Sequence, residues 1–138
     1  MNSFPGSVIA LFLMFGGING DSVVQTEGQV LLSEGDSLIV NCSYESTQYP
    51  SLFWYVQYPG EGLQLLLKAM KFNDKESNKG FEATYHKETT SFHLEKDSVQ
   101  ESDSAVYFCA LSEGGNRALV FGKGTRLSVI PNIQNPDP

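Results

Sequence analysis

The Ser, His and Asp residues of this chain, which could in principle carry catalysis, form no recognisable catalytic or metal site. His86 and His93 are the only histidines, and neither stands at metal-ligand spacing from a cysteine or from the other histidine. The sequence contains no G-x-S-x-G, H-E-x-x-H or phosphate-binding-loop motif. We therefore expect no enzymatic activity, no cofactor and no bound metal.

The size and charge of the chain indicate one globular domain that does not bind nucleic acid. The 138 residues suffice for one ordinary domain, and 41% of them are hydrophobic, as in domains with a packed core. Nine Lys and Arg residues stand against sixteen Asp and Glu residues, which gives a formal net charge of -7. Because contact with phosphates needs a basic surface, we expect no nucleic-acid partner.

Residues 1–20 carry no charged side chain and predict a secretory signal peptide. The apolar run from Val8 to Phe15 is followed by a glycine-rich stretch that ends at Gly20. Eight apolar residues are too few to cross a bilayer, which takes about twenty, but they suit the apolar region of a signal peptide. The segment lacks the usual Lys or Arg, and a buried apolar strand is the alternative. We expect cleavage near Gly20 and export of the remainder.

Cys42 and Cys109 are the only cysteines and lie 67 positions apart. This separation is unlike the close spacing of a metal knuckle or of a redox Cys-x-x-Cys motif. In an exported chain the expectation is a single disulfide between them. On chain-entropy grounds, closing so long a loop stabilises the fold by about 4 kcal/mol.

Asn41-Cys42-Ser43 is the only N-x-Ser/Thr sequon of the chain. Side chains alternate along a strand, so Asn41 points outward when Cys42 points inward. Asn41 is therefore a candidate glycosylation site, and an unused sequon is the alternative.

The elements that must position these residues are short strands. From residue 21 onward, apolar and polar residues alternate in short runs that are separated by Gly, Pro, Asn, Asp and Ser clusters. No segment longer than two turns has helical periodicity. Many short antiparallel strands predict a sandwich or a barrel. The expected strands are 37–42, 52–57, 63–68, 81–85, 92–94, 106–111, 118–121 and 125–130.

Three residue types in one order narrow the fold further. Trp54 follows Cys42 by twelve positions, and Tyr107 precedes Cys109 by two. A disulfide between two facing sheets needs a large ring beside it to fill the space between the layers, and Trp54 supplies that volume. Tyr107 points to the same face as Cys109, and its hydroxyl can bond back to the preceding loop as a tyrosine corner. The combination predicts an immunoglobulin-like sandwich.

Four segments carry a more specific resemblance. Residues 103–109 (DSAVYFC) resemble the D-x-A-x-Y-x-C signature of V-set domains, and 121–125 (FGKGT) resemble the F-G-x-G-T motif of a joining segment. Residues 54–60 (WYVQYPG) are similar to the framework that follows the first hypervariable loop of T-cell receptor alpha chains, and 132–138 (NIQNPDP) resemble the opening of their constant region. From Asp21 to Pro138 the chain thus resembles a T-cell receptor alpha variable domain.

This resemblance implies an all-β fold, an immunoglobulin V-type Greek-key β-sandwich of two antiparallel sheets. The implied domains are a signal peptide over 1–20, a V-set domain over 21–130, and the start of a constant region or a linker over 131–138. One departure concerns Asp103, whose equivalent in many V domains pairs with an Arg before the fourth-strand Phe. Here Lys79 and Gly80 precede Phe81, so the pair is either uncertain or made by Lys79.

The resemblance also places three ligand-binding loops at one end of the sandwich: 46–51, 69–75 and 110–120. Each loop interrupts the alternation with turn residues, and recognition usually sits on loops of a rigid scaffold; inert connectors are the alternative. Arg117 offers a bidentate donor to a ligand, or pairs with Glu113 instead. The expected ligand contacts are Ser46, Thr47, Gln48, Tyr49, Pro50, Ser51, Ala69, Met70, Lys71, Phe72, Asn73, Asp74, Ser112, Glu113, Gly114, Gly115, Asn116 and Arg117.

A second expected surface bears outward-facing aromatic residues. Because Trp54 and Cys109 point inward, their neighbours Tyr55 and Phe108 point outward. In the family this sheet face packs on a partner V domain, whereas isolated surface aromatics are the alternative. The expected partner contacts are Tyr55, Gln57, Leu63, Phe108 and Phe121.

The function that the resemblance implies is antigen recognition as one half of a heterodimer. The expected partners are a T-cell receptor beta chain and a peptide–MHC or MHC-like ligand. The expected location is the secretory pathway and then the extracellular face of the plasma membrane, with membrane attachment only through a region absent from this chain. The alternatives are a delta-chain or an antibody light-chain variable domain that binds a free antigen, and residues 132–138 favour the alpha chain.

Overall fold

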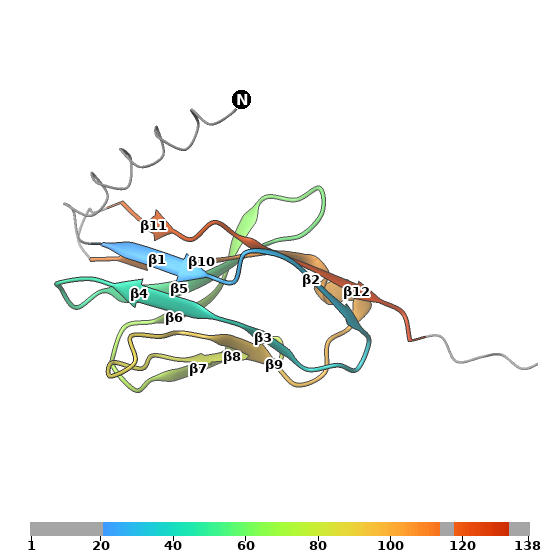
Figure 1. Cartoon of the computed structure of the whole chain (residues 1–138), viewed down its shortest axis with the longest axis horizontal. Helices are drawn as coiled ribbons and strands as arrows, with labels where there is room; N and C mark the ends of the chain where they lie inside the picture. The colour runs from blue at the N-terminus through green and yellow to red at the C-terminus, as the bar shows by residue number, and fades with distance from the viewer. Residues whose placement is uncertain (1–20, 114–117, 133–138) are drawn as a thin grey trace, which may run out of the picture.

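The computed structural model describes residues 21–113 and 118–132. The expected signal peptide over 1–20, the tip of the third loop over 114–117 and the last six residues lie outside these ranges. In chain order the described elements are β1 (Ser22–Gln25), β2 (Gly28–Ser33), β3 (Leu38–Val40), β4 (Cys42–Glu45), β5 (Ser51–Gln57), β6 (Leu63–Ala69), β7 (Lys75–Asn78), β8 (Phe81–Thr84), β9 (Leu94–Lys96), the 3-10 helix η1 (Glu101–Asp103), β10 (Ala105–Ser112), β11 (Val120–Phe121) and β12 (Thr125–Ile130) (Figure 1).

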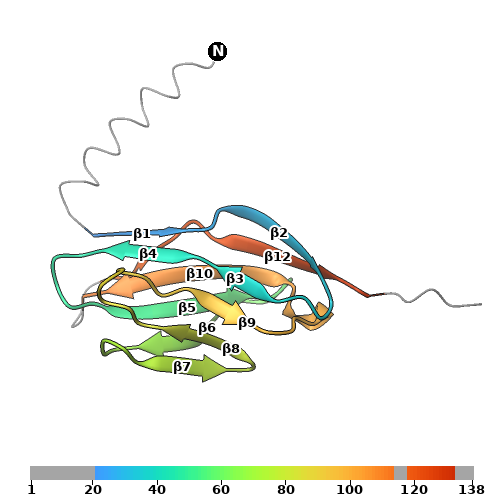
Figure 2. The ribbon, with the colours of Figure 1, turned by 60° about the horizontal axis from the view of Figure 1, so that its bottom comes forward.

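The strands form the expected sandwich of two packed layers (Figures 1 and 2). One layer has the order β2-β12-β10-β5-β6, with β11 also paired to β10. The other has the order β3-β9-β8-β7, and β4, which continues from β3, pairs with β1. Strand pairing is antiparallel except between β12 and β2, which run parallel. The predicted V-type sandwich is confirmed, with this one parallel pair in otherwise antiparallel sheets.

The predicted strand over 37–42 is divided at Asn41, because the chain changes pairing partner there. β3 pairs with β9, whereas β4 pairs with β1. The backbone N–H of Asn41 donates to Thr26 Oγ1 at 3.0 Å, and its carbonyl accepts the N–H of Thr26 at 3.1 Å. Beyond Thr26 the chain leaves β1 and crosses to the other layer as β2, whose first residue, Gly28, has a φ of 87°.

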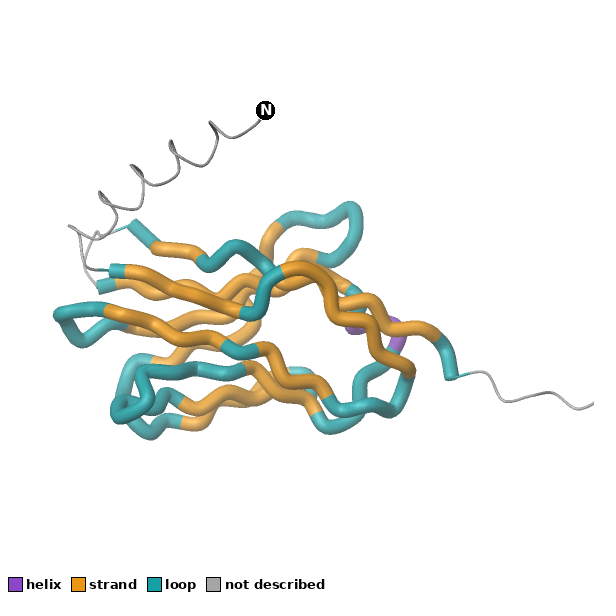
Figure 3. The backbone as a smooth tube through the Cα atoms, viewed as in Figure 1, coloured by secondary structure: helices purple, strands orange, loops and turns teal. Residues whose placement is uncertain are grey.

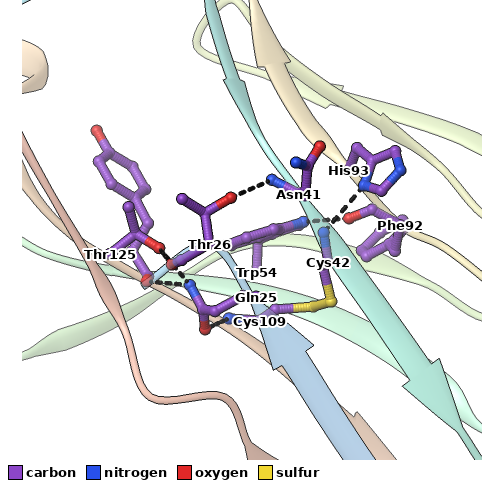
Figure 4. The surroundings of a disulfide bond; sticks show 10 residues. Gln25, Thr26, Asn41, Cys42, Trp54, Phe92, His93, Cys109 and Thr125 are labelled. Carbon is purple, nitrogen blue, oxygen red and sulfur yellow. Dashed lines mark hydrogen bonds between the residues drawn. A yellow bond between two sulfur atoms is a disulfide. The ribbon is translucent and has the colours of Figure 1, made fainter. Parts of the chain in front are cut away.

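The predicted disulfide is present, and the indole ring of Trp54 packs beside it as predicted. Cys42 on β4 and Cys109 on β10 form a disulfide with a Cα–Cα distance of 6.4 Å (Figure 4). Trp54 lies directly opposite Cys109 in the ladder, is fully buried, and donates its indole N–H to the carbonyl of Phe92 at 2.8 Å. The Tyr107 hydroxyl donates to the carbonyl of Asp103 at 2.5 Å, which is the predicted tyrosine corner.

The buried carboxylate of Asp103 pairs with Lys96, so the assignment of this ion pair to Lys79 is wrong. Lys96 Nζ lies 2.9 Å and 3.1 Å from the two Asp103 oxygens and 4.8 Å from the centroid of the Phe81 ring. Lys96 is the β9 residue directly opposite Phe81. Its ammonium therefore lies beside the Phe81 ring and within reach of Asp103. Lys79 sits in the β7–β8 turn with a φ of 56°, and its ammonium lies 5.9 Å from the centroid of the half-buried Tyr58 ring.

Candidate recognition and pairing surfaces

The three predicted loops lie at one end of the sandwich (Figures 1 and 3). They are the connections between β4 and β5, between β6 and β7, and between β10 and β11. Their bases are fixed by strand pairs, since Ser51 faces Ser112, Leu52 faces Ala69, and Leu111 faces Val120. The sandwich therefore presents the loops side by side from a rigid support.

The predicted ligand contacts are exposed, half-buried or buried, and the half-buried ones are Ser46, Ser51, Phe72, Asp74, Ser112 and Glu113. Tyr49 and Met70 expose 53% and 55% of their surface at the tips of the first and second loops. Thr47, Gln48, Lys71 and Asn73 are also exposed. Pro50 and Ala69 are buried, so these two residues support the loops and do not present a side chain to a ligand. Gly114 to Arg117 lie outside the described residues.

The first loop contacts the described part of the third. Ser46 Oγ donates to a carboxylate oxygen of Glu113 at 2.7 Å. A hollow of about 460 Å³ lies between the two loops, lined by residues that include Thr47, Gln48 and Ala118. Glu113 thus acts across the loops, and the alternative pairing with Arg117 concerns a residue outside the described ranges.

The five predicted partner contacts lie together on the sheet of β5, β6, β10 and β11. The Phe121 ring lies 5.6 Å from the Tyr55 ring and 6.3 Å from the Phe108 ring, centroid to centroid. Phe121 and Leu63 are 41% and 46% exposed. With Phe108 and Gln57 they line an open hollow of about 260 Å³. We call this surface the aromatic face.

Two glycines of the FGKG segment allow the aromatic face and the core to pack closely. A Cβ on Gly122 would lie 2.3 Å from Gln25 Oε1, and a Cβ on Gly124 would lie 2.7 Å from the Phe108 ring. Gly124 also has a φ of 98°, which favours glycine. Steric crowding therefore requires glycine at both positions of the FGKG segment.

Gln25 is a structural residue that the sequence pattern did not single out. Its side-chain amide is buried and donates to the Tyr107 carbonyl and to Thr125 Oγ1, each at 2.9 Å, while its oxygen accepts the N–H of Cys109 at 3.0 Å (Figure 4). It thereby ties β1 to β10 and β12 beside the disulfide. No local signal identifies this role, because the partners lie 82 to 100 residues away in sequence.

The two histidines lie in the layer that contains β8 and β9. His93 Nδ1 accepts the backbone N–H of Cys42 at 2.9 Å, which requires an unprotonated Nδ1. Burial lowers the pKa of His93, with an opposing contribution from Glu95 and a smaller lowering from His86. In the described parts of the chain, His, Cys, Asp and Glu side chains form no group of three or more that is suited to hold a metal ion.

Over residues 21–113 and 118–132, no helix has both the length and the apolar character that a membrane span requires.

Comparison with known proteins identifies the family. Residues 25–130 match the profile of the immunoglobulin V-set domain. Human T cell receptor alpha variable 9-1 is 89% identical over 112 residues, which cover 81% of this chain and 100% of the relative. Human T cell receptor alpha variable 9-2 is 71% identical over the same share of each chain, and the mouse T-cell receptor alpha chain V region CTL-F3 is 54% identical over 95% of this chain and 100% of its own length. A V-set sandwich with three loops at one end, a single disulfide packed on Trp54 and these relatives together show that the chain belongs to the T-cell receptor alpha variable domains, which recognise antigen and are not enzymes.

Proposed function

We propose that this domain pairs with the variable domain of a beta chain through the aromatic face and recognises a peptide–MHC or MHC-like ligand through its three loops. The observation that carries the pairing is the exposed cluster around Phe121 and Leu63 with its 260 Å³ hollow. Contiguous exposed apolar surface on a soluble domain marks an interaction site. Large aromatic residues are also the side chains most enriched in such interfaces.

The pairing is tested by charge substitution on the aromatic face. Leu63→Asp and Phe108→Asp should each sharply reduce the yield of heterodimer on co-expression with candidate beta chains, because a carboxylate would be desolvated there without a partner. Ile39→Asp is the matched control, since Ile39 is 59% exposed but lies on β3 in the other layer. Heterodimer yields that stay at the parental level in both variants would refute the assignment of this face.

The assignment of the ligand surface is tested on the loops themselves. Tyr49→Ala, Asn116→Ala and Arg117→Ala should weaken binding by about 1 kcal/mol or more at one or more positions, the usual scale for interface hot spots. The probe is a ligand recovered by screening the heterodimer against multimeric peptide–MHC and MHC-like libraries. Parental affinity in all three variants would exclude the loops as the binding surface.

The same proposal includes export. Residues 1–20 serve as a signal peptide that is removed near Gly20, and the mature domain then stands on the extracellular face of the plasma membrane. Support comes from the apolar, uncharged composition of the segment and from the disulfide, since disulfides persist in oxidising compartments. N-terminal sequencing of the secreted chain tests the cleavage position.

A further inference from the structure

The first and second loops are joined by a pair of stacked rings. Tyr49 of the first loop and Phe72 of the second lie with centroids 4.2 Å apart and planes inclined by only 10°. The backbone N–H of Phe72 also donates to the Tyr49 hydroxyl oxygen at 3.2 Å. Two independent interactions therefore connect loops that lie more than twenty residues apart in sequence.

This pair rests on Tyr85, a fully buried residue just beyond β8. The Tyr85 ring stands edge-on to Phe72 at 5.2 Å and to Tyr49 at 6.3 Å. Its hydroxyl donates to the carbonyl of Pro50 at 2.5 Å. Burial raises the pKa of Tyr85, so this hydroxyl keeps its proton at physiological pH and remains a donor.

The backbone around Tyr85 fixes the second loop as well. The Tyr85 carbonyl accepts the N–H of Asn73 at 2.7 Å, and the Tyr85 N–H donates to the carbonyl of Asp74 at 2.9 Å. Lys87, two residues further on, brings its ammonium to 5.0 Å from the centroid of the Phe72 ring. The β8–β9 connection thus holds the second loop through backbone bonds and through a cation beside the ring.

We infer that Phe72 is a positioning residue that locks the first loop to the second, so that Tyr49 is presented to the ligand in one preformed orientation. The inference rests on the proposed function of the loops. More than half of the Tyr49 surface remains exposed although its ring is stacked, so one part of the ring is held and another is free for contact. Ordering flexible side chains and loops opposes binding. A locked aromatic residue contributes contact area with little of that cost.

The test measures the unliganded full chain after secretion, by site-resolved amide hydrogen exchange. Phe72→Leu keeps an apolar side chain but removes the ring, and it should speed exchange in the first loop, at Gln48, by about tenfold through local opening. Tyr49→Ala should have the reciprocal effect on the amides of Phe72 and Asn73. Phe72→Tyr restores the ring and should restore slow exchange.

Two controls separate this lock from a general loss of stability. Met70→Ala changes an exposed residue of the same loop that makes none of these ring contacts, and it should leave exchange at Gln48 at the parental rate. The amide of Cys109 donates to buried Gln25, so it reports global opening and should be unchanged in Phe72→Leu.

Parental exchange at Gln48 in Phe72→Leu would overturn the inference, as would equal acceleration at Gln48 and Cys109. Because these measurements use no ligand, their failure leaves the proposed function standing. Conversely, failure of the ligand-binding test leaves the lock itself intact.

Discussion

Removing Lys96 from its ion pair with Asp103 should strongly destabilise the domain, whereas removing Lys79 should have little effect. The Lys96 and Asp103 side chains are 12% and 9% exposed. Removing one partner of a buried pair leaves an uncompensated charge and costs about 3–5 kcal/mol. The backbone N–H of Gln100 donates to Asp103 at 2.8 Å and would still do so in the variant. Lys96→Ala should therefore lower the free energy of unfolding by an amount near the lower end of this range, about 3 kcal/mol.

The matched control is Lys79→Ala, a surface change with an expected effect within about 0.5 kcal/mol. The assay is equilibrium urea unfolding of the secreted chain at pH 7, followed by the fluorescence of Trp54, the only tryptophan. Measurement at two protein concentrations excludes a contribution from self-association through the aromatic face. A free energy of unfolding that falls as much in Lys79→Ala as in Lys96→Ala would refute the reasoning.

Three further predictions concern the surroundings of the disulfide. Gly122→Ala should lower the melting temperature by several degrees, because its Cβ would displace Gln25, whereas Gly62→Ala, with no atom within 4 Å of the added Cβ, should leave it nearly unchanged; equal melting temperatures would contradict this. Asn41 is exposed and should carry a glycan when the chain is secreted from a eukaryotic host, so Asn41→Gln should migrate faster on gels, and identical migration before and after glycosidase would exclude it. The folded pKa of His93 is depressed below 6.5, so the unfolded state binds the proton more readily and stability should fall as the pH drops below 6.5 toward that depressed pKa; His93→Gln, which retains an acceptor for the Cys42 N–H, should flatten this dependence, and an unchanged slope would exclude His93 as its source.

The strands that the sequence predicts are those with one face in the core. β5 alternates between buried and partly buried residues along Leu52 to Val56, and β12 alternates between buried residues and exposed or partly buried ones from Thr125. The sequence of both strands therefore shows a hydrophobic period of two. β1, β2 and β7 were missed because they lack that contrast. β7 has no buried residue, and β2 is exposed or only partly buried along its length. β7 exists through backbone pairing to β8, β2 through pairing to β12, and β1 through pairing to β4, which leaves no hydrophobic alternation to detect.

The assignment of partners across the fold failed for a related reason. Lys79 lies two residues before Phe81 in the sequence, but the pairing of β8 with β9 sets Lys96 opposite Phe81. The partner is therefore determined by register, which is not visible in one sequence. Pro50 and Ala69 were expected at the ligand surface because the resemblance includes them in the loops, and their burial follows from the packing of the loop bases.

The FGKG segment over 121–124 connects the third loop, the disulfide and the aromatic face in a single structural unit. The Gly122 N–H donates to the Cys109 carbonyl at 2.7 Å, and the pairs Ala110–Phe121 and Leu111–Val120 close the base of the loop. Gly122 leaves room for Gln25, which holds the N–H of Cys109, and Gly124 leaves room for the Phe108 ring. Because these contacts lie below residue 113 on one side and beyond residue 119 on the other, none of them uses a side chain from the tip of the loop. The sequence of the tip can therefore change without altering the position of the disulfide or of the aromatic face, which is the property that a receptor needs when recognition has to vary while pairing stays constant.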